Sequence, residues 1–490
     1  DDDSYSTQAS FFDYDLDGDL DVYLLNHNIH RTNDNELERL KNDRHPYVGD
    51  KLFRNNMNTG QMSFTDVSDA AGISGNALSY GLGVSVGDLN QDGWPDIYVS
   101  NDYLEKDYMY INQKNGTFSD QLTQLTGHTS NFAMGTDIGD FNNDGWPDIM
   151  VADMVAEDNY RQKTNMSGMN PERFWRAANN GFHFQYMINT LQLNNGVSPH
   201  DGKSLPFSEI SQFAGVSNTD WSWAPLWFDM DLDGKKDLFI SNGLRKDARN
   251  NDFSKKKKAF IEAFPEAKGP EYNRAMKQVL DAMPAKRIPN YTFQNQGGLT
   301  LASVAENWGT NQPSFSAGAA YADLDNDGDL DLVVNNLDDP AFVYENLAVQ
   351  QKKGHWLGIT FKGPKNNPDG IGARVWVTVG NERQLYEHYL TRGYQSSVSP
   401  GLRIGLGEAT VIDKLEVQWP DGKRQERKQQ QSDRMLLLSY DNAKDSPSST
   451  KKPKATFTDI TQQAGVSFEH KENNFDDFER EPLLPHQMSA

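Results

Sequence analysis

The sequence has no cysteine among its 490 residues, which excludes disulfide bonds, thiolate metal sites and a cysteine nucleophile. It also has no apolar run near the ~18 residues that a membrane-spanning helix requires. The ten histidines are scattered and form no H-E-x-x-H pair, and neither a G-x-S-x-G elbow nor a phosphate-binding loop occurs. These absences remove several common signatures of hydrolases and nucleotide-binding enzymes.

Positive charge is scarce as well. The 47 Lys and Arg residues face 70 Asp and Glu residues, so the net charge is −23, the wrong sign for a nucleic-acid surface. The chain opens on three aspartates without a methionine, so we expect it to be a piece of a longer polypeptide. A missing leader is therefore uninformative.

What the chain does have is an acidic stretch of nine residues that occurs five times, beginning at residues 13, 88, 140, 229 and 323. Every copy places Asp or Asn at positions 1, 3, 5 and 9 and glycine at position 6, as in D-Y-D-L-D-G-D-L-D at 13–21. The alternation turns every second side chain toward one ion, and the glycine permits the sharp turn that brings position 9 back. Such oxygens suit a hard cation that takes about six to eight ligands at roughly 2.3–2.6 Å, which predicts Ca²⁺.

The predicted ligands are the side chains at positions 1, 3, 5 and 9, together with the backbone carbonyl at position 7. By turn, these residues are Asp13, Asp15, Asp17, Asp19 and Asp21; Asp88, Asn90, Asp92, Trp94 and Asp96; Asp140, Asn142, Asp144, Trp146 and Asp148; Asp229, Asp231, Asp233, Lys235 and Asp237; and Asp323, Asp325, Asp327, Asp329 and Asp331. The sequence thus predicts about five bound Ca²⁺.

An EF-hand begins in the same way but requires a glutamate at position 12 and helices on both sides. Position 12 is occupied here by Leu24, Val99, Val151, Ile240 and Val334, none of which can ligate. Short aliphatic runs follow each copy and are typical of buried strands. The motif is therefore interpreted as a calcium turn between two strands, and five in-frame copies outweigh the alternative of a solvated acidic turn.

Each turn is preceded by a strand of small residues. After several turns a third strand ends in asparagine, as in 51–55 and 108–112, and a fourth strand follows. Four strands per repeat is the period of a β-propeller blade. Residues 1–350 are therefore predicted to form an all-β propeller with about five blades. Two insertions, 154–186 and 245–287, are predicted to contain helices, and the second carries 12 Lys and Arg against 6 Asp and Glu.

From residue 353 the turns stop and alternating strands separated by turn residues predict a small β domain over 353–440. Residues 441–456, with their Ser, Pro and Lys, are predicted to be a linker. The segment F-T-D-I-T-Q-Q-A-G-V at 457–466 restates F-T-D-V-S-D-A-A-G-I at 64–73. We therefore expect 457–490 to begin a further repeat or propeller unit.

The turn-and-strand units resemble FG-GAP (VCBS-type) repeats, the calcium-binding blades also found in the integrin α-subunit propeller. The 353–440 domain, with H-W-L-G at 355–358, D-G-I-G-A-R-V at 369–375 and W-P-D-G-K at 419–423, closely resembles an ASPIC/UnbV domain. Together they are similar to the cartilage acidic protein-like group, and the restart after a linker resembles long exported proteins of Bacteroidota. The resemblance implies a seven-bladed propeller whose first two blades lie outside this sequence. It also implies an exported or surface-anchored protein and, for a lipoprotein, an anchoring cysteine in the missing N-terminus.

The predicted function is a non-enzymatic, calcium-binding scaffold or ligand-binding module that is secreted or lies on the bacterial outer-membrane surface. Its expected partner is a protein or glycan of the cell surface, for example as an accessory subunit of a TonB-dependent transporter-type uptake complex. The alternative is a propeller-type polysaccharide lyase or glycoside hydrolase. We expect the two insertions to lie near each other, since both follow the second strand of a blade, and to combine Phe174 and Trp175 with the local positive charge. Trp221, Trp223 and Trp308 are further candidate stacking residues, although core packing is the commoner role of such residues in propellers.

Overall fold

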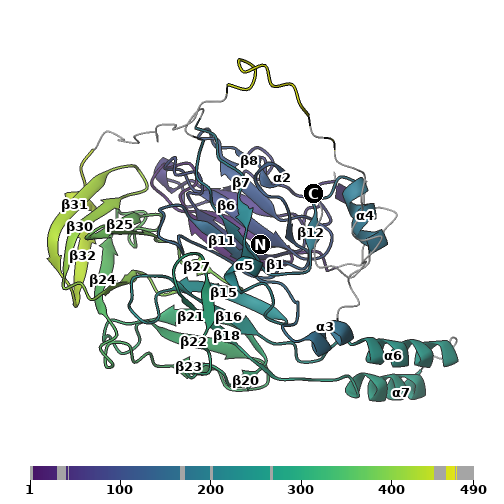
Figure 1. Cartoon of the computed structure of the whole chain (residues 1–490). Coiled ribbons are helices and arrows are strands. Elements are labelled where there is room, and N and C mark those ends of the chain that lie inside the picture. Colours follow the sequence, from purple (N-terminus) through teal and green to yellow (C-terminus); the bar gives the residue numbers. More distant parts are fainter. Residues whose placement is uncertain are drawn as a thin grey trace.

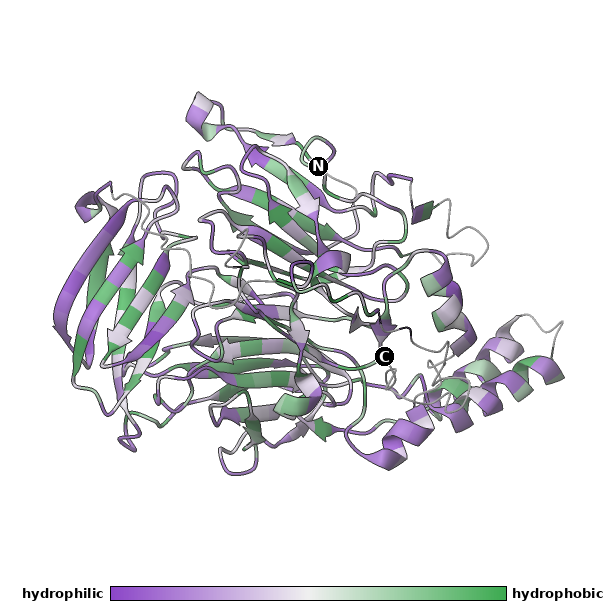
Figure 2. Ribbon diagram, turned by 45° about the horizontal axis from the view of Figure 1, so that its top comes forward, coloured by the Kyte–Doolittle hydropathy of each residue, from purple (hydrophilic) through white to green (hydrophobic). Residues whose placement is uncertain are grey.

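The computed structural model describes residues 4–29, 40–41, 43–165, 171–198, 202–264, 269–445, 460–469 and 471. Strands dominate these ranges, as the all-β prediction requires. A central group of repeated sheets lies between a C-terminal β domain on one side and several helices on the other (Figure 1). Figure 2 shows that apolar residues are concentrated in the strands of the central sheets.

Four of the repeated sheets are four-stranded antiparallel meanders, and the fifth has three strands. The first two contain β1 (Ser6–Phe12), β2 (Asp21–Asn26), β3 (Lys51–Asn55) and β4 (Phe64–Asp66), then β5 (Gly81–Gly87), β6 (Asp96–Asn101), β7 (Tyr108–Asn112) and β8 (Phe118–Asp120). The third and fourth contain β10 (Thr136–Gly139), β11 (Asp148–Val151), β13 (Thr190–Leu193) and β14 (Ser208–Glu209), then β15 (Ser222–Phe228), β16 (Asp237–Asn242), β18 (Tyr291–Asn295) and β19 (Leu301–Ser303). The fifth contains β21 (Ser316–Ala322), β22 (Asp331–Asn336) and β23 (Phe342–Tyr344).

The first strands of the five sheets pack side by side in chain order, β1, β5, β10, β15 and β21. Their small residues allow this close approach: a side chain on Gly83 would collide with the Ser100 hydroxyl and the Met134 carbonyl. Apolar residues of neighbouring sheets then share cores, so that Leu25 and Leu52 of the first sheet cluster with Val84 and Val99 of the second. This is the arrangement of propeller blades, and the fold class predicted from the sequence is confirmed, while the blade number stays a prediction.

Short elements complete the central part. They are η2 (Met57–Thr59), α2 (Leu122–Leu125), α5 (Ser211–Ala214), the parallel pair β9 (Thr129–Ser130) and β12 (Gln185–Tyr186), and the antiparallel pair β17 (Ile288–Pro289) and β20 (Pro313–Ser314). No helix within the described ranges is both long enough and apolar enough to span a membrane.

Both predicted insertions contain helices, α3 (Asn159–Asn165) and α4 (Pro171–Asn179) in the first, and α6 (Asn251–Ala263) and α7 (Pro270–Asp281) in the second. The insertions meet, as expected, because Arg161 of α3 pairs with Asp247 at 3.2 Å and with Asp220 at 2.5 Å. However, α4 lies apart from the α6–α7 hairpin in Figure 1, and Phe174 stacks on Phe184 and Tyr186. The expected joint aromatic and cationic patch is therefore divided between two places.

The C-terminal domain packs a three-stranded sheet against a four-stranded one. The sheets contain, in spatial order, β29 (Leu402–Gly407), β24 (His355–Lys362) and β32 (Arg434–Ser439), and β26 (Glu382–Glu387), β25 (Arg374–Val379), β30 (Val411–Gln418) and β31 (Arg424–Gln431). Alternate residues of both sheets meet in a core that includes Leu357, Val375, Ile404 and Trp419. The described fold continues through η3 (Tyr440–Asn442) to residue 445, five residues past the predicted boundary. Residues 446–456 and most of 457–490 lie outside the described residues.

A short hairpin of the C-terminal domain, β27 (Thr391–Arg392) and β28 (Ser396–Ser397), reaches into the centre of the repeated sheets. Strand β27 contacts β1, β5, β10 and β15, and β28 contacts β21, so the hairpin touches the first strand of every sheet. The Arg392 guanidinium bonds to the Asp137 carboxylate at 2.7 Å, and Gly393 donates to the Thr136 carbonyl at 3.0 Å. The hairpin therefore packs where the five sheets converge.

Candidate metal centres

The five acidic turns share one backbone conformation. Their fourth residues have left-handed φ values between 54° and 63°, and their glycines have φ between 89° and 112°. The fourth residues are Leu16, Gln91, Asn143, Leu232 and Asn326. A branched apolar residue such as leucine avoids this region, at a cost of roughly 1–2 kcal/mol. The recurrence therefore shows that the turn geometry overrides local preference.

Backbone amides hold the carboxylates at positions 1 and 9. Asp13 accepts hydrogen bonds from the amides of Asp17 at 3.0 Å and Gly18 at 2.9 Å. Asp21 accepts from the amides of Tyr14 at 3.0 Å and Asn55 at 2.8 Å. The carboxylate at position 9 accepts two backbone amides in each of the other four turns as well. At position 1 both amides recur in the second and third turns and the glycine amide recurs in the fourth, so the backbone orients these carboxylates before any ligand binds.

Several carboxylate oxygens nevertheless have no partner although they are buried. In the first turn these are Oδ1 of Asp15 and Asp19; in the fourth and fifth turns they are Oδ1 of Asp229, Asp231, Asp323 and Asp329. Asp19 and Asp329 are fully buried. Buried polar atoms in proteins normally have partners, so these unpartnered oxygens are suited to ligate a cation.

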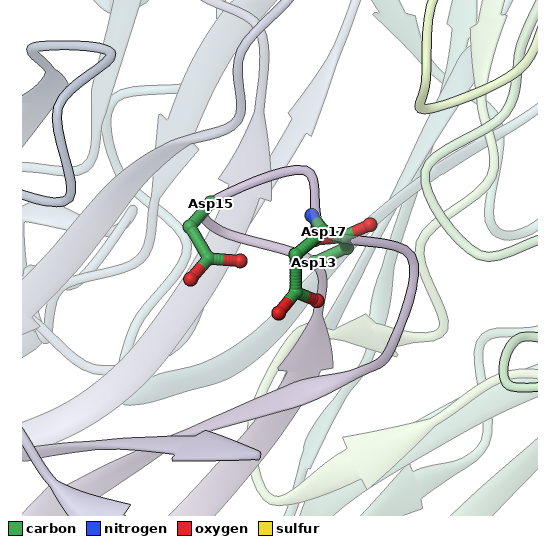
Figure 3. A group of neighbouring side chains, drawn as sticks. All are labelled: Asp13, Asp15 and Asp17. Carbon is green, nitrogen blue, oxygen red and sulfur yellow. Dashed lines mark hydrogen bonds between the residues drawn. The ribbon is translucent and has the colours of Figure 1, made fainter. Parts of the chain in front are cut away.

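Three turns bring three carboxylates within 4.8 Å of one another. These groups are Asp13, Asp15 and Asp17 (Figure 3), Asp229, Asp231 and Asp237, and Asp323, Asp325 and Asp327. The second and third turns carry three side-chain carboxylates each and have Asn90 or Asn142 at position 3. All five turns therefore offer oxygen ligands, and the first, fourth and fifth are the richest in charge.

Burial and crowding raise the pKa values of these carboxyl groups. The pKa of Asp13 rises to about 7, through burial first and then through the negative charges of Asp17 and Asp15. The pKa of Asp229 rises to about 8, again through burial and then through Asp233 and Asp231. A divalent cation would stabilise the ionised forms and offset both causes. The acidic turns therefore fit a divalent cation in their ligand chemistry and their electrostatics.

Position 7 differs among the turns. The side chains of Asp19 and Asp329 accept backbone hydrogen bonds at 2.9 Å, whereas Lys235 reaches back to Asp233 at 2.5 Å. Trp146 packs against Gly196, where a side chain would collide with its ring. Ligation by the position 7 carbonyls stays a prediction.

A network of asparagines joins the turns to one another. Asn295, which ends β18, donates from its side chain to Lys236 O in its own turn at 3.0 Å and to Phe141 O in the preceding turn at 2.7 Å. Asn112, Asn194 and Asn346 make the equivalent pairs of bonds. The sequence showed an asparagine at the end of several third strands, but its role as a link between neighbouring turns is visible only in three dimensions.

The C-terminal domain covers the face formed by the turns. Arg374 pairs with Asp88 of the second turn at 2.5 Å, and Arg403 pairs with Asp323 of the fifth turn at 2.7 Å. At the fourth turn Gly405 lies so close to Asp229 that a Cβ atom would stand 1.9 Å from its carboxylate oxygen. The sequence did not predict these contacts.

A cavity of about 60 Å³ remains between the turns and this domain. Its lining includes Asp140, Asp229 and Asp323, the first residues of three turns, together with Lys236 and Arg392. It is large enough for a few water molecules, each of which needs roughly 10–15 Å³. The acidic and basic side chains that line the cavity belong to the interface between the turns and the C-terminal domain.

Comparison with known families and proteins finds two kinds of match. A family model for FG-GAP-like repeats matches residues 13–99 and 88–151, and a model named ASPIC and UnbV matches residues 363–445. Human integrin alpha-6 is 34% identical over 166 residues, which are 31% of this chain and 13% of the integrin. Integrin alpha-3 of Cricetulus griseus is 29% identical over 119 residues, 22% of this chain and 11% of the integrin. The chain thus matches only about a tenth of the length of these relatives.

Two solved structures overlap more of the chain at low similarity. An Agrocybe aegerita lectin described as recognising non-reducing terminal N-acetylglucosamine has a TM-score of 0.30 and 14% identity, covering 70% of this chain and 67% of its own. The V. cholerae biofilm matrix protein Bap1 has a TM-score of 0.30 and 10% identity, covering 86% of this chain and 59% of its own.

Proposed function

We propose that this chain, which carries FG-GAP-like repeats followed by an ASPIC and UnbV domain, is a calcium-stapled, non-enzymatic ligand-binding or scaffold module that works outside the cytosol. The resemblance drawn from the sequence is confirmed for both parts. The finer assignments, namely Ca²⁺, the partner and the cellular location, are proposals.

The observation that carries the metal proposal is the group of buried, unpartnered oxygens in turns of one shared conformation. The residues that would hold the ion are those at positions 1, 3, 5 and 9 of each turn, with the position 7 carbonyl. Bound Ca²⁺ would neutralise clustered carboxylates and cross-link each turn. It would thereby stabilise the edge on which the C-terminal domain rests.

The two ends of the repeated sheets have different roles. The C-terminal domain covers the turns, whereas both insertions leave the opposite ends of the second strands β11 and β16. Figure 1 shows the resulting arrangement, with that domain and the helices on opposite sides. Insertions are also specific to individual repeats. We therefore assign partner binding to the insertion side.

The chemistry of this side favours an acidic partner. Lys255, Lys256, Lys257 and Lys258 are exposed on α6, whose hairpin with α7 projects from the body. The whole insertion 245–287, with 12 Lys and Arg against 6 Asp and Glu, has a local charge of +6 in a chain of net charge −23. An acidic cell-surface protein or glycan is the proposed partner, and a bacterial outer-membrane surface, with a TonB-dependent transporter-type complex, is its proposed setting.

Metal analysis of the dialysed protein tests the first part of the proposal. We expect about five Ca²⁺ per chain, and one fewer in the double variant Asp229→Asn with Asp231→Asn. Asp338→Asn, which changes an exposed residue paired with Arg245, is the matched control and should keep every ion. Fewer than three Ca²⁺ in the unaltered protein, or a preference for Zn²⁺, would contradict the ligand argument.

Replacing 251–281 by a short Gly-Ser turn tests the binding side. We expect the variant to keep its calcium and to lose capture of the native partner from surface extracts. Undiminished capture of every partner would contradict this assignment. The charge variant Lys255→Glu with Lys257→Glu separates charge from fold, because both side chains are exposed.

A further inference from the structure

The fifth sheet has an open edge. The other four sheets end in a fourth strand, β4, β8, β14 or β19, whereas the fifth ends at its third strand, β23. An unpaired edge presents free amide and carbonyl groups that can pair with another strand. The described residues therefore contain one sheet with a vacant position at its edge.

The vacant position leaves an apolar side chain exposed. When third strands are aligned on the asparagine at or just after their C-terminal end, Val343 corresponds to Leu52, Met109, Leu191 and Thr292. All four counterparts have 0% exposure, while Val343 has 65%. The fifth sheet thus lacks the cover that its neighbours possess.

The chain also contains a further copy of the unit that covers a third strand, and the structure describes its residues 460–466. Residues 457–466, F-T-D-I-T-Q-Q-A-G-V, match the fourth-strand units F-T-D-V-S-D-A-A-G-I at 64–73 and F-S-E-I-S-Q-F-A-G-V at 207–216. The turn at 460–466 has the same backbone hydrogen bonds as the two within sheets. Ala464 N donates to Ile460 O at 2.7 Å and Val466 N to Thr461 O at 3.2 Å, as Ala71 N does to Val67 O at 2.8 Å and Ile73 N to Ser68 O at 2.9 Å.

The last apolar residue of this turn is buried in the sheets and exposed at 460–466. Ile73 and Val216 have 2% and 0% exposure, and each lies in the core that covers its third strand. Their counterpart Val466 has 59% exposure, and Ile460 has 55%. The unit therefore exposes an apolar surface of the kind that would cover Val343.

We propose that residues 457–466 of a second copy of this chain add to β23 as the fourth strand of the fifth sheet. The complete sheets define the register, because Asn55 faces Phe64, Asn112 faces Phe118 and Asn295 faces Leu301. Asn346 then faces Phe457, and Glu345 faces Thr458. The amide of Ile460 donates to Val343 O, as Val67 N does to Leu52 O at 2.9 Å.

We assign the added strand to a second copy because of the place at which the chain leaves the C-terminal domain. The backbone of Lys444 forms a β-bridge with that of Arg424, and Arg424 lies opposite Gln418 in the sheet. The side-chain amide of Gln418 lies close to Gly93 of the second turn. In the order of the sheets, the third and fourth lie between the second sheet and the fifth, which contains β23. Residues 446–456 span at most about 40 Å when fully extended. A neighbouring chain reaches the edge without crossing these sheets, and reciprocal exchange closes a dimer.

Disulfide trapping tests the proposal on the full chain, which has no cysteine of its own. A Glu345→Cys chain is mixed with a Thr458→Cys chain under mild oxidation. We expect a cross-linked dimer of twice the 55.2 kDa chain mass, several-fold more abundant than with Glu382→Cys in place of Glu345→Cys. Glu382 is a suitable control because it is exposed on β26, another edge strand.

Two outcomes would overturn the proposal. One is a cross-linking yield equal to that of the control. The other is a double variant, Glu345→Cys with Thr458→Cys, that forms only an intramolecular disulfide, which would place the strand in its own chain. Sedimentation supplies a second measurement: Val466→Asp changes an exposed residue and should convert the dimer to monomer. An unchanged mass distribution would contradict the proposed contact, whatever the metal content of the turns.

Discussion

The Arg374 guanidinium of the C-terminal domain lies 2.5 Å from the carboxylate of Asp88, the first residue of the second turn. Both side chains are buried, and Glu387 lies 3.5 Å from the same guanidinium. Burial raises the pKa of Asp88, and the positive charge of Arg374 opposes that rise. The C-terminal domain is therefore joined electrostatically to a predicted metal turn.

Replacing Arg374 by glutamine should destabilise the protein by about 3 kcal/mol, since removal of one partner leaves buried charges uncompensated. The loss should be larger in chelator than in Ca²⁺, because a cation in the turn would also neutralise Asp88. Urea unfolding measures it. Arg383→Gln, which breaks a pair with Glu416 on an arginine that is 53% exposed, should cost less than about 1 kcal/mol. Equal losses in the two variants would contradict this account.

Chelation should lower the melting temperature. An ion that binds only the folded state stabilises it by about 4 kcal/mol at a thousandfold excess over Kd. The measurement is a thermal melt with and without EDTA, with metal removal verified. Restoring Ca²⁺ should restore the transition, and an unchanged melt of the stripped protein would show that the turns do not depend on metal.

Asn295→Ala should lower the free energy of unfolding by about 1–3 kcal/mol, because the carbonyls of Phe141 and Lys236 lose their shared donor. The matched control is the neighbouring Gln296→Ala, whose side chain is exposed and donates to Gln294 Oε1 at 2.9 Å. If both variants unfold at the same urea concentration, the asparagine link contributes nothing.

Stability should depend on pH with opposite signs in chelator and in Ca²⁺. The folded-state pKa values of Asp13 and Asp229, about 7 and about 8, exceed their ordinary value of 3.8. Between the ordinary pKa of 3.8 and the raised values of about 7 and about 8, the metal-free folded state therefore binds more protons than the unfolded state. Acidification from pH 8 to 5.5 consequently stabilises the metal-free folded state. Bound Ca²⁺ requires ionised ligands, so its affinity falls over the same range.

Melting temperatures at pH 5.5 and 8 check both signs. Half-buried His183 and buried His388, whose pKa values fall to about 4 through burial, act against the metal-free trend but are fewer than the raised carboxyl groups. The same direction of change in EDTA and in Ca²⁺ would contradict the assignment of these carboxylates as ligands.

The turns and their flanking strands could be predicted because each turn is nine consecutive residues. Its ligands are therefore placed by local backbone geometry, which the alternation of aspartates and the glycine specify. The strands follow from runs of aliphatic residues, and the C-terminal domain from its alternation. These features need no information about distant residues.

The sequence could not place the aromatic residues of α4 relative to the lysines of α6. Topology puts both insertions at one end of the sheets, and the Arg161–Asp247 pair confirms that they meet. The direction in which each helix leaves depends instead on packing, such as that of Phe174 on Phe184.

By itself the sequence determined the repeat, the likeness of its units to known families and the chemistry of the turns. Only the tertiary structure decided that the C-terminal domain rests on those turns and that its hairpin enters the centre of the sheets. Arg374 and Asp88 are 286 positions apart, and in β25 this arginine has the pattern of a solvent-facing residue. Its partner is selected by the complementary shape and charge of two completed surfaces, and these surfaces exist only after both domains have folded.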